Sequence, residues 1–243
     1  MPDPARPSNT QDSLISADEN RRMFDYIAGF YDGTNMILSL GLDGYWRRKA
    51  VARLEPVSGG LYLDVGCGTG DVSLEILSRS PGSRIVGIDP SDGMLEVGRA
   101  KIQTAGLSHA ISFIKGDALN IQFRDSSFDG VITSFCIRNV TDRLRALKEF
   151  KRVLRPGGKL VILELTDPTG RVMKPLFRVY SRVVMPLVTK ITSSMPAYRY
   201  LTDSMIDFPQ AEKFRALIQE AGFASIEHFP MTGGITTVFV GYS

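Results

Sequence analysis

The chain has 243 residues, of which 43% are hydrophobic and 23% are charged, and its net charge at pH 7 is +3. This length and composition suit one domain with a sizeable core. The charge is too small and too dispersed to argue for a nucleic-acid partner. No apolar run approaches the roughly 20 residues of a membrane-spanning helix. The first fourteen residues also lack the basic and apolar regions of a signal peptide.

We expect residues 1–16 to form a disordered tail and residues 17–243 to form a single domain. The two cysteines, Cys67 and Cys136, fall in different predicted loops. They have no metal-ligand spacing, and we expect them to be small apolar side chains in a reducing compartment. The sequence predicts no metal site.

Residues 17–55 are expected to form a helical lid. Phe24, Ile27, Phe30 and Tyr31 recur at helical spacing, and core packing explains these four side chains. It explains the polar side chains of Asp32 and Asn35 less easily. We therefore take Asp32 and Asn35, with the neighbouring Tyr31, as candidates to face a ligand.

The stretch LDVGCGTGD, residues 63–71, combines an apolar run with a turn that carries Gly66, Gly68 and Gly70. The helix-like segment VSLEILSRS follows it. This order is typical of a strand, a backbone loop and a helix N-terminus that hold a nucleotide-like ligand.

Four further runs rich in Val and Ile predict strands within residues 84–91, 111–119, 128–139 and 159–165. Between them lie helical patterns. One covers residues 141–154, with Thr141 as its expected N-cap and the Pro-Gly-Gly of residues 156–158 as its stop. Strands that alternate with helices in this way indicate a parallel sheet covered on both faces.

Residues 168–205 are expected to form an amphipathic insertion. A helix over residues 171–191 would place Arg171, Lys174, Arg178 and Arg182 on one stripe and apolar side chains on the other. Pro175 fits its first turn and Pro186 a kink. Two interpretations stay open: an ordinary helix packed on the sheet, or a lid that receives an oily substrate while its basic stripe meets anionic lipid headgroups.

The end of the chain departs from the alternating pattern. A helix with Pro209 in its first turn is expected to end near Gly222, and two strands, SIEHFPM and ITTVFVGY, follow around a turn with Gly233 and Gly234. A mostly parallel sheet that closes with an antiparallel hairpin resembles the Rossmann-like, seven-stranded class I fold of S-adenosylmethionine-dependent methyltransferases. This α/β architecture differs from that of a dinucleotide dehydrogenase, which continues with parallel units.

Acidic residues around the glycine loop favour the same cofactor. Asp71 stands where the dinucleotide motif has its third glycine, and a carboxylate is a poor neighbour for pyrophosphate. S-adenosylmethionine has no phosphate and carries a sulfonium and an ammonium, which suit Asp64 before the loop and Asp71 after it. Asp89 ends the second strand, where it can accept hydrogen bonds from ribose hydroxyls. Asp117 ends the third, where it can take the adenine amino group beside the Ala118 backbone.

Over residues 21–242 the sequence resembles the ubiquinone/menaquinone biosynthesis C-methyltransferases, a family that includes demethylmenaquinone methyltransferases. The motifs that carry the resemblance are MFDYIAGFYDGTNMILSLGLDGYWRR, LDVGCGTGD, FCIRNVTD, RVLRPGGKL and YRYLTDSMIDFP. Family members often have Gly where this chain has Cys136. We expect a cofactor-binding set and a substrate set. For the first set the resemblance implies Thr69, Asp89, Asp117, Ala118 and Ser134, to which the loop argument adds Asp64, Gly66 and Gly68. The expected substrate set is Tyr31, Asn35 and Tyr198.

Methylation of a ring carbon requires an electron-rich ring, so the expected substrate is a reduced quinol. Arg138 and Asn139, just past the fourth strand, are placed to orient a phenolate or a water molecule. Arg138 would act through its charge, because a guanidinium stays protonated. The alternative for both residues is a structural bridge to the next helix. Asp32 is the third catalytic candidate, and His109 and His228 are expected to be structural or solvated.

We thus predict C-methylation of a polyprenylated quinol, from demethylmenaquinol to menaquinol or the benzoquinol equivalent. A methyltransferase of another small phenol is the nearest alternative, followed by a nicotinamide-dependent oxidoreductase and a non-catalytic cofactor-binding module. The prenylated quinol is the expected partner, and nucleic acid is not. The predicted location is cytoplasmic, with peripheral contact at the inner face of the membrane. A homodimer and a quinone-biosynthesis complex are both left open.

Overall fold

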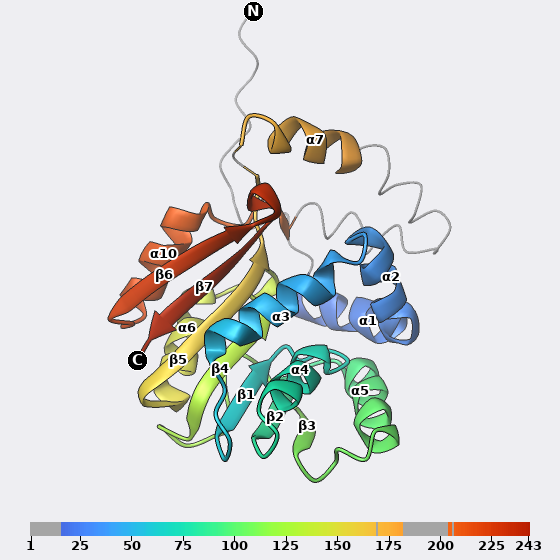
Figure 1. The fold of residues 1–243 in the computed structure, drawn as a ribbon, viewed down its shortest axis with the longest axis vertical. Helices are drawn as coiled ribbons and strands as arrows, with labels where there is room; N and C mark the ends of the chain where they lie inside the picture. Colours follow the sequence, from blue (N-terminus) through green and yellow to red (C-terminus); the bar gives the residue numbers. More distant parts are fainter. Residues whose placement is uncertain (1–15, 169, 182–203, 206) are drawn as a thin grey trace, which may run out of the picture.

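The structure is a computed structural model that describes residues 16–168, 170–181, 204–205 and 207–243. At its centre lies one seven-stranded sheet with the order β3-β2-β1-β4-β5-β7-β6 (Figure 1). The strands are β1 (Leu61–Val65), β2 (Arg84–Asp89), β3 (Ile111–Lys115), β4 (Phe128–Ser134), β5 (Leu154–Leu165), β6 (Ser225–Met231) and β7 (Thr236–Tyr242). Strands β1 to β5 are parallel, and β7 is antiparallel to both β5 and β6. The predicted fold class is confirmed.

Helices cover both faces of the sheet (Figure 1). One face packs against α3 (Leu42–Leu54), α4 (Asp71–Arg79) and α5 (Asp92–Thr104), and the other against α6 (Arg143–Val153) and α10 (Ala211–Glu220). Strand β5 shows how the sequence produces this arrangement. Leu160 and Ile162 belong to the core cluster of one face, while Val161 and Leu163 belong to the other. A continuous apolar run is therefore buried on both sides.

Three short helices precede β1: α1 (Ala17–Ile27), α2 (Tyr31–Leu38) and α3, with a 3₁₀ turn at Ala28–Phe30. Ser16 and Glu19 form a capping box that starts α1. The Asp25 carboxylate then accepts hydrogen bonds from Ser91 Oγ at 2.6 Å and from Gly93 N at 3.0 Å. These contacts join α1 to the start of α5, directly after β2.

Three expected boundaries need correction. The cap of α6 is Asp142, whose side chain accepts from Arg145 N, and not Thr141. Helix α10 begins at Ala211 after Gln210, so Pro209 precedes the first turn. Strand β5 begins at Leu154, directly after α6, so the Pro-Gly-Gly stretch lies inside the strand, beside a register shift at Phe128 and Gly130. At α6 the physical reason is the cap itself, because the Asp142 carboxylate accepts the Arg145 N–H at 2.9 Å.

Only part of the expected amphipathic insertion can be placed. Helix α7 spans Met173–Val179, with Pro175 in its first turn as expected. Arg182, Pro186 and Tyr198 lie outside the described residues, as does the expected tail except for Ser16. None of the described helices is both long enough and apolar enough to cross a membrane.

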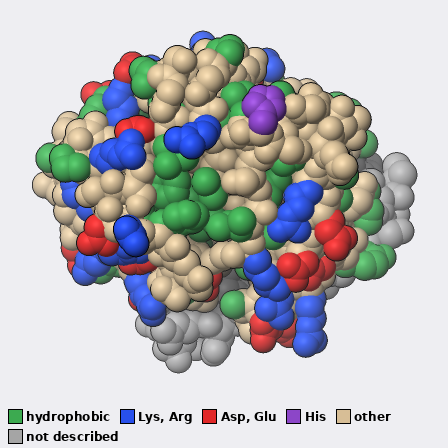
Figure 2. Space-filling model, turned by 90° about the horizontal axis from the view of Figure 1, so that it is seen from below, with side chains coloured by type: hydrophobic (Ala, Val, Ile, Leu, Met, Phe, Trp, Pro, Cys, Tyr) green, Lys and Arg blue, Asp and Glu red, His purple; other side chains and the backbone are tan. Residues whose placement is uncertain are grey.

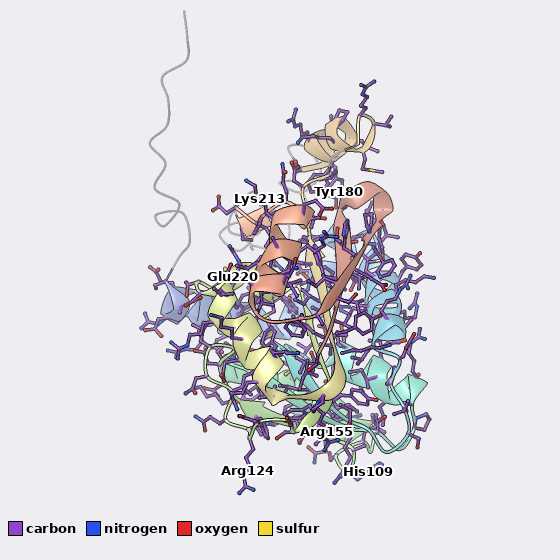
Figure 3. The ribbon with its side chains drawn as sticks, turned by 90° about the vertical axis from the view of Figure 1, so that its left-hand side faces the viewer. His109, Arg124, Arg155, Tyr180, Lys213 and Glu220 are labelled. Atoms are coloured by element: carbon purple, nitrogen blue, oxygen red, sulfur yellow. The ribbon has the colours of Figure 1, made fainter. Side chains whose placement is uncertain are left out.

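Figure 2 shows the end of the molecule opposite α7, where hydrophobic side chains gather near the centre and Lys and Arg alternate with Asp and Glu around them. In Figure 3, His109, Arg124 and Arg155 lie at this end, and Tyr180 lies at the other. His109 Nδ1 is 3.0 Å from the Gly106 carbonyl oxygen, a local contact within its loop.

Candidate active site

Two cavities open at the carboxyl ends of the parallel strands. The first, of about 280 Å³, is walled by the glycine loop, by the ends of β2, β3 and β4, and by α1. The second, of about 390 Å³, lies between α2, α3, α7 and the turn that joins β6 to β7, and most of its wall is apolar. Among the described residues, Tyr31 and Phe135 line both. The two cavities therefore meet at these two aromatic side chains.

The glycine loop shapes the first cavity through its backbone. The N–H groups of Gly66 and Cys67 both donate to the Ile88 carbonyl, at 2.8 and 3.1 Å, which fixes the loop to the end of β2. Gly68 has a φ of +53°, and a Cβ built there would meet nothing within 4 Å. Because Gly68 lines the cavity, a ligand can approach its backbone closely.

Asp89 provides the main polar group of this cavity. One carboxylate oxygen accepts from Gly68 N and the other from Ser91 N, each at 2.9 Å. Each oxygen keeps further acceptor capacity for a ligand hydroxyl. Burial raises the pKa of Asp89 to about 6, although the two backbone hydrogen bonds oppose this shift.

Three other predicted cofactor residues are placed to meet an adenosine moiety, and a fourth, Asp64, is not. Asp117, Ala118 and Ser134 line the same cavity as Asp89. The Ser134 hydroxyl is buried and has no hydrogen-bond partner among the described residues, so it can bond to a ligand. Asp64 lies deeper: it accepts from Ser73 Oγ at 2.7 Å, and burial raises its pKa to about 7. Asp64 is absent from the cavity wall and supports the loop from below.

Asp32 and Thr69, by contrast, line neither cavity. Thr69 Oγ1 donates to Asp32 Oδ1 at 2.6 Å, and Lys101 Nζ pairs with Asp32 Oδ2 at 2.5 Å. Asp71 pairs with Lys101 at 2.9 Å and with Arg47 at 3.2 Å. Asp71 lines neither cavity, and two protein cations pair with its carboxylate, so the expected contact with a cofactor cation stays a prediction. This ionic network joins the lid to the glycine loop.

On the substrate side, Tyr31, Asn35 and Arg138 line the second cavity. Burial raises the pKa of the Tyr31 phenol, against a hydrogen bond with Asn35 that lowers it, so the phenol is neutral at pH 7. Asn139 lines the cofactor cavity and not the second one. The short turn Ile137–Asn139 points the two neighbours Arg138 and Asn139 at different cavities.

Arg138 is buried and paired. Its Nη1 donates to Glu164 Oε1 at 2.8 Å and to the Phe135 carbonyl at 2.5 Å, and its backbone N–H donates to Glu164 Oε2 at 3.2 Å. Glu164 is fully buried. The sequence analysis did not identify Glu164, although a lone acid in the apolar run KLVILEL is a signal that could have found it.

Among the remaining titratable candidates, only Cys136 lines one of these two cavities, the cofactor cavity. His228, on β6, is 3.8 Å from Glu212 and lines neither cavity. Cys67 and Cys136 are free thiols, as expected. Burial raises the pKa of Cys67 well above its usual value and that of Cys136 to about 12, so both stay protonated.

Comparison with known proteins agrees with this geometry. Residues 14–243 match the ubiE/COQ5 methyltransferase family. The chain belongs to this family. It is 44% identical over 222 residues to the ubiquinone/menaquinone biosynthesis C-methyltransferase UbiE of Geotalea uraniireducens, covering 91% of this chain and 94% of the relative. It is 40% identical over 224 residues to the demethylmenaquinone methyltransferase of Bacteroides fragilis, covering 92% and 91%.

Solved structures show the same fold at lower sequence identity. A methyltransferase from Thermotoga maritima has a TM-score of 0.64 at 23% identity, covering 91% of this chain and 98% of its own. Phosphoethanolamine N-methyltransferase 2 of Haemonchus contortus, solved with S-adenosylmethionine, has a TM-score of 0.63 at 18% identity, covering 81% and 52%. The predicted family, fold, methyltransferase activity and S-adenosylmethionine cofactor are confirmed. The oxidoreductase and the non-catalytic module are thereby set aside.

The raised pKa of Asp89 predicts how this UbiE-family site responds to pH. If the ribose hydroxyls donate to the ionised carboxylate, affinity for S-adenosylhomocysteine should be constant above pH 6 and fall by about tenfold per pH unit below it. Asp89→Asn should weaken binding by about 1.5–3 kcal/mol and remove the pH dependence. Calorimetric titrations from pH 5 to 8 measure both. If affinity still changed with pH in Asp89→Asn, the titrating group would be Asp64, and the proposed hydrogen bonds from the ribose to Asp89 would be contradicted.

Proposed function

We propose that the protein transfers the methyl group of S-adenosylmethionine to a ring carbon of a polyprenylated benzoquinol or naphthoquinol. The observation that carries this proposal is the junction of the two cavities. A cleft that carries Asp89, Asp117 and Ser134 adjoins a more apolar cavity of about 390 Å³, which suits an aromatic ring with an oily tail. The names of both relatives, which concern ubiquinone or menaquinone, support the same substrate class.

When bound, S-adenosylmethionine would supply an electrophilic methyl group for the ring carbon. Asp89, Asp117 with the Ala118 backbone, and Ser134 would hold the adenosine part beside Gly66 and Gly68. Asp64 and Thr69, behind this wall, would keep the loop in shape. The chain's task on the other side is to hold a reduced ring, favour loss of its hydroxyl proton and exclude water.

We assign recognition of the substrate hydroxyl to Arg138, and we assign Tyr31 and Asn35 as further hydrogen-bonding groups for the quinol. A guanidinium in the cavity wall lowers the pKa of a substrate hydroxyl and stabilises its oxyanion. Glu164 holds the guanidinium in place and offsets part of its charge. Asp32 lies in the lid's ion pairs, so its catalytic role is proposed through lid position only. Tyr198 stays a prediction, because it lies outside the described residues.

We further propose that the mouth of the second cavity contacts a membrane surface. Leu40, Leu42 and Leu176 line the cavity and yet are exposed, with Leu40 exposed to 71%. Arg178 on α7 and Arg171 just before this helix are exposed, and no acidic residue occurs in the sequence from Pro168 through Thr202. Apolar side chains with basic neighbours suit an anionic bilayer, from which a prenyl tail could enter. This arrangement fits a peripheral location, and homodimerisation stays a prediction.

The membrane proposal is tested by sedimentation with vesicles of phosphatidylglycerol or phosphatidylcholine. The double variant Leu40→Ser and Leu176→Ser should lose binding to the anionic vesicles. Val57→Ser is the matched control, because Val57 is an exposed apolar residue of the loop before β1. Equal loss in both variants, or no binding by the unaltered protein, would contradict the membrane contact.

The substrate proposal is tested with labelled S-adenosylmethionine and, in turn, reduced prenylated naphthoquinol, reduced prenylated benzoquinol and a small phenol without a tail. Methylation of a prenylated quinol on carbon, identified by mass, is the expected result. Labelling of the small phenol alone would favour the alternative, another phenolic substrate. The oxidised quinones are the matched control and should give no product, because their rings are electron-poor.

A further inference from the structure

Phe135 forms the sheet side of the junction between the two cavities. It directly follows β4, the central strand, and is one of two described residues that line both cavities. The other, Tyr31, belongs to α2 in the lid. A ring that enters from the second cavity to meet the methyl donor must therefore pass between these two side chains.

The backbone of Phe135 is held in an unusual conformation. Its φ is +56°, in the left-handed region that bulky residues rarely adopt. The Phe135 N–H donates to the Leu163 carbonyl at 2.8 Å, and its own carbonyl accepts from Arg138 Nη1 at 2.5 Å. Such a conformation persists only where the surroundings fix it, and residues of this kind cluster at functional sites.

The ring of Phe135 is fixed as well. It packs edge-to-face against Trp46, with 6.2 Å between the ring centroids. Trp46 Nε1 in turn donates to Thr232 Oγ1 at 2.8 Å, in the turn between β6 and β7. The side chain thus stands on a rigid support that links α3, the end of β4 and the hairpin, whereas Tyr31 sits on the lid.

A quinol presents two nucleophilic atoms to a methyl donor: a hydroxyl oxygen and the adjacent ring carbon. Transfer to carbon breaks the S–C bond, leaves its electron pair on sulfur and releases the proton of the ring carbon. Transfer to oxygen breaks the same bond and releases the hydroxyl proton instead. Both steps balance, so the position of the ring decides between them, and a displacement of about 1 Å is enough to alter the rate about 10²-fold.

We propose that Phe135 is the residue that determines this choice: its fixed ring sets the quinol so that the ring carbon, and not the hydroxyl oxygen, faces the cofactor cavity. The inference rests on the proposed function, because it assumes a quinol in the second cavity. Arg138 and Glu164 have a second task in this arrangement, since Arg138 also holds the Phe135 carbonyl. In this arrangement Phe135 contacts the substrate directly, and Arg138 holds Phe135 in position.

Trp46 gives a readout that needs no turnover. It is the chain's single tryptophan, it lines the second cavity and it touches Phe135. An oxidised prenylated naphthoquinone, added without cofactor, should quench its fluorescence. Phe135→Leu and Phe135→Gly should raise the concentration for half-quenching about tenfold, since one wall of the ring site is lost. Glycine accepts a φ of +56° without strain, so Phe135→Gly removes the ring while keeping the backbone conformation.

With reduced quinol and a saturating concentration of labelled cofactor, Phe135→Leu should lower methylation on carbon about 10²-fold and yield an O-methylated product, while S-adenosylhomocysteine still binds through Asp89, Asp117 and Ser134. Phe177→Leu is the matched control: Phe177 lines the second cavity only, so tail binding should weaken without O-methylation. Unchanged rate and product in both Phe135 variants would overturn the inference. So would a joint loss of melting temperature and S-adenosylhomocysteine affinity. If the unaltered protein neither quenches nor methylates any quinol, the proposed function fails instead.

Discussion

Replacing Arg138 with Gln is expected to lower the rate of methyl transfer by about 10²–10³-fold, the usual loss for one oxyanion donor. Affinity for S-adenosylhomocysteine should stay nearly unchanged, because Arg138 lines the second cavity and not the cofactor cavity. The pH at which activity rises should move upward, since without the guanidinium the substrate hydroxyl keeps its proton to higher pH. Turnover measured from pH 6 to 10, beside calorimetry, checks both effects.

The structure adds a complication that the experiment must control. Arg138→Gln leaves the buried Glu164 carboxylate without its charge partner, which costs about 3–5 kcal/mol of stability in comparable buried pairs. The double variant Arg138→Gln with Glu164→Gln removes both charges and should recover most of the melting temperature. Its activity should stay low. Recovery of activity together with stability, or an unshifted pH profile, would show that Arg138 is only a structural bridge.

Sequence reasoning predicted that the candidate cofactor residues which follow the strands would lie together. Parallel strands bring their carboxyl ends to one edge, so Asp89, Asp117 and Ser134 could be expected to lie together before any coordinates were known. The structure places all three in one cavity wall. Whether they bind the cofactor as proposed is a matter for the Asp89 titration.

Ion pairs between residues that are distant in the sequence could not be predicted from the sequence. Lys101 on α5 pairs with Asp32 and Asp71, which lie 69 and 30 positions earlier, and neither acid lines a cavity. Nothing in the local pattern around Asp32 distinguishes a ligand contact from an ion pair formed through the tertiary fold. Phe135 was missed for a related reason, because a left-handed phenylalanine has no sequence signature.

The glycine loop gives the second large effect. A Cβ at Gly66 would lie 2.2 Å from Cys136 Sγ and 2.6 Å from Cys136 Cβ, at a φ of +67°. Overpacking costs about 1–3 kcal/mol and an unfavourable left-handed conformation of order 1 kcal/mol, so Gly66→Ala should lose about 2–4 kcal/mol of stability. Urea unfolding followed by circular dichroism measures the loss.

Gly68→Ala is the matched control, because Gly68 has a similar φ of +53° but no neighbour within 4 Å of its added Cβ. It should lose only about 1 kcal/mol of stability, and yet bind S-adenosylhomocysteine more weakly, since the new methyl group projects into the cofactor cavity. Adding Cys136→Gly to Gly66→Ala should recover the stability that overpacking cost, while the loss due to the left-handed conformation should remain. Equal destabilisation by Gly66→Ala and Gly68→Ala, or no rescue by Cys136→Gly, would show that contact with Cys136 is not what requires glycine at position 66.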